Sequence, residues 1–263
     1  MSEIHSYYTE SNEADRLLSG SGLLEFHRTQ ELILRNLPAG PLSILDVGGG
    51  PGQYSAWLTT LGHSVYLLDL VEKHLDQASR LGLAGVKQGD ARSLPCENAS
   101  VDAVLLLGPL YHLTAIADRI LAIQEAHRVL KPGGILFAAA ISRYASLLHA
   151  LVDGFVDDDA FWPILTRDLD EGQHRNQTGV PKYFTTSVFH KPEELRDEVR
   201  QGGFPEAEIY GIEGPGWLAK DFDDRWRDQA RRERLLSLVR RVEREAPLLG
   251  SSLHLLAICR KNL

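Results

Sequence analysis

From Leu42 to Ile141, short apolar runs alternate with amphipathic segments. Apolar runs of four to eight residues are typical of buried strands, and residues repeating at helical spacing are typical of helices that pack with one face. Strands that alternate with helices over short connections indicate βαβ units and a mostly parallel sheet. The pattern predicts strands at 43–47, 64–68, 85–87, 101–106 and 135–141, and helices at 53–61, 73–81 and 116–130.

The segments on either side of this alternation differ from it. Residues 11–37 read as two short helices separated by a Gly-Ser-Gly step, which predicts an N-terminal helical cap over 1–40. The alternation stops at 143–190 and resumes with a helix that opens at Lys191. A strand near 208–211, a charged helical region and a last, antiparallel strand at 253–258 complete an α/β domain over 41–263. Its inserted lids are expected at about 143–190 and 212–248.

A glycine-rich turn joins the first strand to the first helix of the domain. The run Ile44-Leu45-Asp46-Val47-Gly48-Gly49-Gly50-Pro51-Gly52 places Asp46 on the strand and glycines at 48, 50 and 52. Glycine has no Cβ, so the turn can be tight and a ligand can touch the backbone. A dinucleotide fingerprint would need its third glycine at position 53, which is glutamine. An ordinary strand–helix connection is the alternative interpretation of these glycines.

An aspartate ends the second predicted strand. In a doubly wound sheet Asp69 would lie beside the glycine turn, where its carboxylate can accept both hydroxyl hydrogens of a ribose. An exposed loop aspartate would have the same sequence context. The glycine turn before it favours the ribose interpretation.

Three further segments follow in order: Gln88-Gly89-Asp90-Ala91, Ser100-Val101-Asp102-Ala103-Val104 and Arg128-Val129-Leu130-Lys131-Pro132-Gly133-Gly134. Together with the glycine turn and Asp69, residues 43–141 resemble the class I S-adenosylmethionine-dependent methyltransferases, in particular those of the ubiquinone/menaquinone type. The resemblance implies a Rossmann-like doubly wound sheet and S-adenosylmethionine as the cofactor. It also implies that Asp90 and Ala91 lie near the adenine amino group and that an arginine of the cap pairs with the methionine carboxylate. Arg28 is the candidate, and a surface ion pair of Arg28 with Glu25 or Glu31 is an equal alternative.

Methyl transfer from a sulfonium is a direct displacement, so alignment, exclusion of water and removal of a proton are what the protein must supply. The fourth strand leads into Tyr111 and His112, and ligands of open α/β sheets bind at the carboxyl ends of strands. We therefore expect Tyr111 and His112 at the reaction site, with His112 as the general base or, alternatively, as a packing residue. Aromatic and polar side chains that could line an acceptor site, or pack in a lid, are Tyr8, Glu25, His174, Tyr183, Phe184 and Trp217. They favour an aromatic or heteroaromatic acceptor, methylated on oxygen, nitrogen or an electron-rich carbon such as that of indole.

Composition and net charge narrow the range of expected partners, metal or disulfide sites and cellular compartments. The net charge is −8, and acidic residues interleave with the arginines of 225–244, which argues against a nucleic-acid partner. The two cysteines, Cys96 and Cys259, form no CxxC pair, so neither a metal site nor a disulfide framework is expected. Without a membrane-length apolar run or a signal-like start, we expect a cytoplasmic protein with no membrane partner, either alone or as a homo-oligomer. The rival functions are a nucleotide-binding oxidoreductase and a non-catalytic Rossmann-like binding module.

Overall fold

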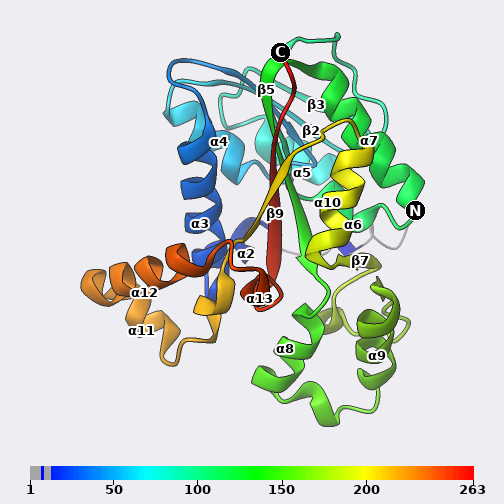
Figure 1. Cartoon of the computed structure of the whole chain (residues 1–263), viewed down its shortest axis with the longest axis vertical. Coiled ribbons are helices and arrows are strands. Elements are labelled where there is room, and N and C mark those ends of the chain that lie inside the picture. Colours follow the sequence, from blue (N-terminus) through cyan, green and yellow to red (C-terminus); the bar gives the residue numbers. More distant parts are fainter. Residues whose placement is uncertain (1–6, 9–12) are drawn as a thin grey trace.

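The centre of the molecule is a twisted nine-stranded sheet (Figure 1). The computed structural model describes residues 7–8 and 13–263 of the 263-residue chain. The strands β3, β2, β1, β4 and β5 lie side by side and parallel, and β9 pairs with β5 in the antiparallel direction, followed by β8. The predicted fold class is thereby confirmed, including the antiparallel last strand. The strands are β1 Ser43–Val47, β2 Ser64–Asp69, β3 Gly85–Gln88, β4 Val101–Leu106, β5 Leu130–Ser142, β6 Gln173–His174, β7 Ser187–His190, β8 Ala207–Gly211 and β9 His254–Arg260.

Helices cover both faces of the sheet. One face packs against α7 and α10, with Ile123 and Val199 in the shared core, and the other packs against α3 and α4, with Leu32 and Leu58. Because both faces are covered, the central strands are almost continuously apolar rather than alternating. The helices are α2 Glu13–Arg16, α3 Ser21–Asn36, α4 Gln53–Thr60, α5 Glu72–Ala78, α6 Pro109–His112, α7 Ile116–Val129, α8 Ala145–Asp153, α9 Trp162–Glu171, α10 Pro192–Gln201, α11 Phe222–Arg227, α12 Gln229–Val242 and α13 Ala246–Leu249.

The fifth strand begins earlier than the sequence predicts. It was expected from residue 135, but β5 starts at Leu130, immediately after α7. The N–H of Gly133 donates to the carbonyl of Lys261, and the N–H of Lys261 donates to Gly134, so residues near the C-terminus supply the missing hydrogen-bond partners. The pairing with β4 shifts register between Val101 and Ala103, as expected of a bulge at these glycines.

The segment 143–190, where the sequence shows no alternation, contains α8, α9 and the short β6–β7 hairpin. The helices α8 and α9 share a small core of their own around Phe161, Ile164 and Leu165. β7 joins the sheet only at the end of β5, through the pairs Ile141–Phe189 and Ser142–His190. The segment is therefore held at the carboxyl end of β5.

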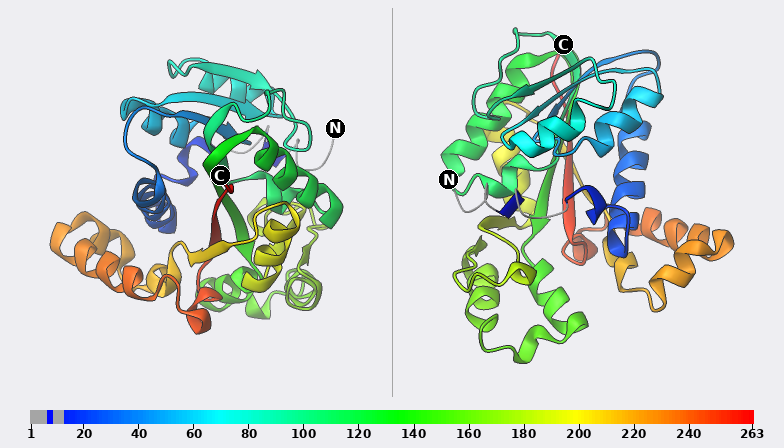
Figure 2. Two further views of the ribbon diagram at one scale, coloured as in Figure 1. Left: turned by 45° about the horizontal axis from the view of Figure 1, so that its top comes forward. Right: turned by 180° about the vertical axis from the view of Figure 1, so that it is seen from behind.

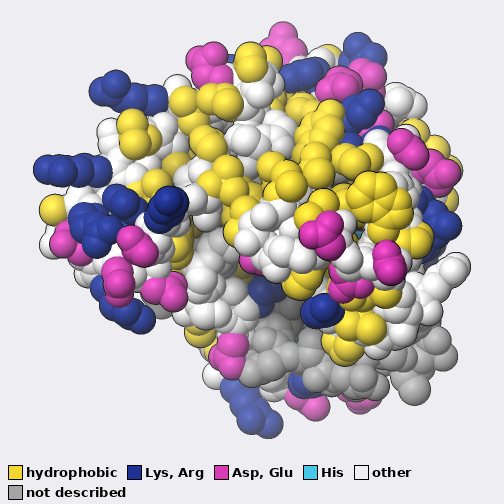
Figure 3. Space-filling model, turned by 90° about the horizontal axis from the view of Figure 1, so that it is seen from below, with side chains coloured by type: hydrophobic (Ala, Val, Ile, Leu, Met, Phe, Trp, Pro, Cys, Tyr) yellow, Lys and Arg dark blue, Asp and Glu magenta, His cyan; other side chains and the backbone are white. Residues whose placement is uncertain are grey.

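Two helical projections extend from this end of the sheet, α8–α9 on one side and α11–α12 on the other (Figure 2). Viewed from that end, arginine and acidic side chains gather over the α11–α12 side (Figure 3). The exposed apolar side chains Leu151, Val152 and Trp162 belong to α8 and α9. None of the helices in the described part of the chain is both long and apolar enough to span a membrane. The predicted cap over 1–40 contributes α2 and α3 here, and its residues 1–6 and 9–12 lie outside the described residues.

Candidate functional site

The glycine turn lies at the carboxyl end of β1 and is tied to the neighbouring strand. The N–H groups of Gly48 and Gly49 donate to the carbonyl of Leu68 in β2, at 2.7 and 3.2 Å. Gly48 and Gly50 have φ of 66° and 57°, a region that other residues rarely adopt. A Cβ at Gly48 would lie 2.8 Å from the ring of Pro109. The turn therefore forms a shallow cradle of bare backbone that only glycine allows.

Asp69 lies beside this cradle, as the sequence predicts. Its Oδ2 accepts a hydrogen bond from the Gly50 N–H at 2.9 Å, and its Oδ1 accepts one from the Val71 N–H at 2.8 Å. The Nδ1 atom of His74 lies 3.3 Å from Oδ1. A carboxylate has about four lone-pair sites, so an oxygen held this way can still accept a hydrogen bond from a ligand. Asp69 is thus a fixed acceptor at the edge of the turn.

A cavity of about 230 Å³ runs along this edge of the sheet. Gly52 does not line it; that glycine starts α4 in the left-handed conformation, and a Cβ there would lie 2.7 Å from Leu81. The Arg92 guanidinium beside Asp90 holds the pKa of that carboxyl below its usual range. The other predicted cofactor residues of the domain all line the cavity: Asp46, Gly48, Gly50, Asp69, Asp90 and Ala91.

Asp46 is the most deeply buried acid of this cavity. Burial raises its pKa to about 7, against the hydrogen bond that Ser55 Oγ donates to its Oδ2 at 2.7 Å, and the charge of Asp69 raises it further. The carboxyl of Asp46 is thus poised to gain or lose a proton near neutrality. A positively charged ligand in the cavity would favour its ionised form.

A second cavity, of about 430 Å³, opens beside the first. Among the residues that the structure describes, three line both cavities: Tyr8, Arg16 and Tyr111. The second cavity has the size and the largely aromatic wall of a small-molecule site. Its further lining residues include Ile141, His149, Phe155, Phe161, His174, Tyr183, Phe184, Phe189 and His254.

Two of the residues predicted for the acceptor site do not line this second cavity. Glu25 is buried and accepts both hydrogen bonds of a bidentate pair with Arg16, at 2.6 and 3.0 Å. Trp217 lies behind the wall, where its Nε1 donates to the Ser251 carbonyl at 2.9 Å and its ring packs against His149. Tyr8, His174, Tyr183 and Phe184 do line it, as predicted.

His174 is held by hydrogen bonds at both ring nitrogens. Nδ1 lies 2.8 Å from Asp168 Oδ2, and Nε2 lies 2.7 Å from the carbonyl of Tyr183. The ring stacks on Phe189 with centroids 4.9 Å apart. Because both nitrogens have partners in the protein, His174 contributes the wall of the cavity rather than a free base.

The position of Arg28 corrects the sequence-based expectation. Its side chain is fully buried and forms ion pairs with Glu31 and Glu243, away from both cavities. Arg16, a residue that the sequence analysis did not single out, lines both cavities instead. An arginine from the N-terminal helices therefore does reach the cavities, but it is Arg16 and not Arg28.

His112 lies at the predicted place but in surroundings that do not suit a general base. Its Nε2 lies 2.8 Å from Tyr8 Oη, and its Nδ1 lies 3.3 Å from the carbonyl of Thr186. The carbonyl can only accept, so Nδ1 carries the hydrogen and Nε2 accepts from the Tyr8 hydroxyl. Burial lowers the pKa of His112 to about 4. At neutral pH His112 is therefore an uncharged, weakly basic side chain, and we assign it a positioning role next to Tyr8 and Tyr111.

The second residue that the sequence analysis missed is His254. It begins β9, pairs in register with Ile141 at the carboxyl end of β5, and lines the second cavity. An available signal was the predicted antiparallel direction of the last strand. A strand that runs against the others brings its first residue to the edge where ligands bind.

Comparisons with known proteins agree with this geometry. A family model described as a methyltransferase domain matches residues 45–138. An uncharacterised methyltransferase of Synechocystis sp. is 32% identical over 148 residues, which make up 54% of this chain and 69% of that protein. A ubiquinone/menaquinone biosynthesis C-methyltransferase of Acidiphilium cryptum is 34% identical over 43% of this chain, and the match spans about half (48%) of that relative's length. The structure of an S-adenosylmethionine-dependent methyltransferase from Mesorhizobium loti superposes with a TM-score of 0.60 at 18% identity, covering 90% of this chain and all of the other, and so shares its fold.

Proposed function

This chain belongs to the class I S-adenosylmethionine-dependent methyltransferases, and on that premise we propose that it methylates a small aromatic or heteroaromatic acceptor. The observation that supports the proposal is the meeting of two cavities at Tyr8, Arg16 and Tyr111. One cavity carries the glycine cradle and acidic acceptors, and the other carries an aromatic wall. A methyl donor in the first cavity and an acceptor in the second would meet at the shared residues.

The residues of the first cavity fit S-adenosylmethionine. Gly48, Gly49 and Gly50 line the cavity without side chains, so their bare backbone is available to the methionine part of the cofactor. We assign the ribose hydroxyls to Asp69, the adenine amino group to Asp90 with Ala91, and the methionine carboxylate to Arg16. Arg16 lines both cavities, and its planar guanidinium has the charge and geometry that suit a carboxylate. When bound, the cofactor supplies an electrophilic methyl group on a positively charged sulfur.

The remaining residues align the acceptor and exclude water. Phe184 and Tyr7 lie edge to face, with ring centroids 5.5 Å apart, and Phe184 also contacts His112 and His174. We assign the segment from α8 to β7 the role of a lid over the acceptor cavity, since it supplies most of the aromatic wall. Flat aromatic surfaces of this kind fit a planar acceptor better than a charged or extended one.

Calorimetry separates this function from its rivals. The purified protein should bind S-adenosylmethionine and S-adenosylhomocysteine and should not bind NAD. An oxidoreductase would show the opposite preference. A non-catalytic binding module would bind the cofactor but transfer no tritiated methyl group to any phenol, amine or indole offered to it.

Substitution of Asp69 should weaken cofactor binding and leave the fold intact. In Asp69→Ala the affinity for S-adenosylmethionine should fall by about 1.5–3 kcal/mol, the range for hydrogen bonds to a charged group. Titration calorimetry measures the loss, and circular dichroism checks the fold. The matched control is Asp76→Ala, an exposed aspartate on α5, which should bind normally. Equal affinity of Asp69→Ala and the wild type would place the ribose site elsewhere.

Cofactor affinity should also depend on pH through Asp46. Its carboxyl has a pKa of about 7 in the free protein, and the positive sulfonium and ammonium groups of the cofactor favour the ionised form. Binding therefore releases a proton below pH 7, and affinity should fall by up to about tenfold for each pH unit below that value. Calorimetry at pH 6 and pH 8 measures the difference, which Asp46→Asn should remove. A pH dependence of equal size in the asparagine variant would assign the proton to another group.

A further inference from the structure

His254, a histidine of the acceptor cavity, has the geometry that His112 of the cofactor cavity lacks. We infer that His254 takes the proton from the acceptor, that Glu213 positions it, and that the acceptor is an aromatic compound with an acidic hydroxyl group. The inference rests on the proposed methyl transfer and deepens it. It specifies the acceptor atom and the residue that receives its proton.

The fold brings His254 to the reaction edge of the sheet. Because β9 runs antiparallel to β5, its first residue pairs with Ile141, near the end of β5. Register partners of an antiparallel pair project from the same face, and both Ile141 and His254 line the acceptor cavity. Arg16 and Tyr111, which border the cofactor cavity, line it with them.

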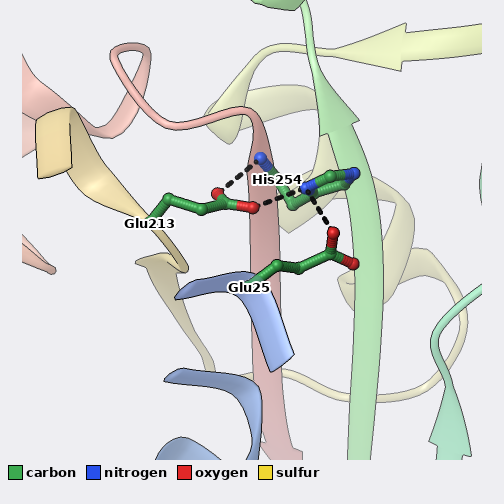
Figure 4. A group of neighbouring side chains, drawn as sticks. All are labelled: Glu25, Glu213 and His254. Atoms are coloured by element: carbon green, nitrogen blue, oxygen red, sulfur yellow. Dashed lines mark hydrogen bonds and ion pairs between the residues drawn. The ribbon is translucent and has the colours of Figure 1, made fainter. Parts of the chain in front are cut away.

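The His254 ring is fixed through one nitrogen. Nδ1 lies 2.6 Å from Glu213 Oε1, and the backbone N–H of His254 donates to Glu213 Oε2 at 3.0 Å (Figure 4). Ser252 Oγ donates to the same Oε2 at 2.7 Å, so the fully buried carboxylate of Glu213 is itself held in place. Nε2 lies on the side of the ring away from the two carboxylates (Figure 4). No residue in the described part of the chain forms a hydrogen bond with Nε2. A carboxylate–imidazole pair with one nitrogen left for the ligand is the arrangement of an oriented base.

The charges around His254 favour its protonated form. Glu25 Oε2 lies 3.7 Å from Nδ1, and Arg16, whose charge acts in the opposite sense, pairs with Glu25. The hydroxyl of Tyr54 also belongs to this surrounding, but the pKa of Tyr54 is raised, so it stays uncharged. Burial alone would lower the pKa of His254, but the charges of Glu25 and Glu213 outweigh it and the pKa is raised above its usual value. His254 is therefore the more basic of the two histidines, since burial lowers the pKa of His112 to about 4.

The same cluster is not built for a cation. Glu25, Glu213 and His254 have ligand atoms within 4.8 Å of one another. Both oxygens of Glu25, however, accept hydrogen bonds from Arg16, and both oxygens of Glu213 accept from Ser252 or His254. A metal ion would compete with these donors for the carboxylate oxygens and would sit beside the positive charge of Arg16. The cluster holds a proton instead.

The proposed step transfers one proton and one methyl group. The acceptor O–H proton moves to Nε2 of His254, and an oxygen lone pair forms the new O–CH₃ bond. The S–CH₃ bond breaks, its electron pair stays on sulfur, and the neutral thioether is left. The imidazolium, paired with Glu213, then releases its proton to water. A neutral amine or an indole carbon can attack before it loses a proton, so such acceptors would need no base of this strength.

Single-turnover transfer of tritiated methyl groups to phenol, 2-naphthol and 4-nitrophenol tests the inference. With phenol the wild-type rate should rise with pH to a plateau above neutrality, and His254→Gln should lose a factor of about 10² to 10⁴. With 4-nitrophenol, which is partly ionised at neutral pH, the loss should be much smaller. Glu213→Gln, which keeps His254, should move the rising limb to lower pH. His63→Gln, at a histidine outside both cavities, should behave as the wild type.

Three results would overturn the inference. The first is a methylation rate of His254→Gln on phenol within tenfold of the wild-type rate. The second is a pH–rate profile of Glu213→Gln whose rising limb lies at the same pH as in the wild type. The third is a wild-type enzyme that methylates amines or indoles but none of the three hydroxyl compounds, which would leave the proposed methyltransferase function intact. Failure to bind S-adenosylmethionine in calorimetry would instead contradict the proposed function itself. If His254→Gln does not fold, the pH–rate profile of Glu213→Gln tests the inference in its place.

Discussion

Replacing Gly48 with valine is expected to reduce the affinity for S-adenosylmethionine by more than 100-fold. Gly48 has φ of 66°, where a side chain costs about 1–2 kcal/mol, and its Cβ would lie 2.8 Å from the Pro109 ring, an overlap of the kind that costs about 1–3 kcal/mol in packed interiors. The turn can relieve the backbone strain and the overlap with Pro109 only by moving the backbone that forms the cradle. A loss of about 3 kcal/mol corresponds to the stated factor at 1.4 kcal/mol per tenfold. Titration calorimetry measures the loss directly.

The chain offers a matched control in Gly62. It also has positive φ, 88°, but no atom lies within 4 Å of its would-be Cβ, and it lines neither cavity. Gly62→Val should therefore carry the conformational strain alone, lowering stability without changing cofactor affinity. If Gly62→Val weakened binding as much as Gly48→Val, the effect would come from general destabilisation rather than from the cradle.

Replacing Arg28 with methionine is expected to lower the free energy of unfolding by about 3–5 kcal/mol. The fully buried guanidinium forms ion pairs with Glu31 and Glu243 and donates to the carbonyl of Ile212. Removing the buried guanidinium leaves two carboxylates whose remaining partners, Arg35 for Glu243 and Arg240 for Glu31, are only partly buried. Denaturant unfolding, followed by circular dichroism, measures the change.

An exposed ion pair provides the comparison for Arg28. Arg227 pairs with Asp224 on α11, with both side chains more than two thirds exposed, so Arg227→Met should leave stability unchanged within error. Since Arg28 lies outside both cavities, cofactor affinity of the folded Arg28→Met protein should stay normal. A selective loss of cofactor affinity without loss of stability would restore Arg28 to the carboxylate-binding role that the sequence suggested.

The central sheet could be predicted because its signal is local. The strands β1, β2 and β4 are short apolar runs bounded by turn residues, and the bounds of β1 to β4 in the structure differ from the prediction by at most one residue. The early start of β5 could not be predicted, because residues 130–134 owe their strand conformation to Lys261, far away in the sequence. The helices α8 and α9 were missed for a related reason: they pack mainly on each other and on a small separate core.

The cofactor half of the site could also be predicted from local sequence signals, whereas the acceptor half could not. The cofactor half is formed mostly by segments between Asp46 and Ala91 that each follow a strand. The order and spacing of these segments in the sequence were therefore sufficient to predict this half of the site. The acceptor half combines residues from Tyr8 to His254, and no local pattern connects them. The choice between Arg16 and Arg28 depends on which helix face meets the core. The weak basicity of His112 depends on its burial and on Tyr8, which only the folded chain reveals.

The antiparallel last strand also fixes the order in which the two cavities can form during translation. The described residues that line the cofactor cavity all lie between Tyr8 and Leu113, so they are synthesised well before β9. The acceptor cavity needs Leu253 and His254, which are synthesised after those residues, and β9 is the strand that joins β8 to β5. Until it arrives, the nascent chain exposes unpaired edges on β5 and β8, the kind of surface at which incomplete chains aggregate. A bound methyl donor would therefore stabilise the early half of the molecule while the acceptor half is still unfinished.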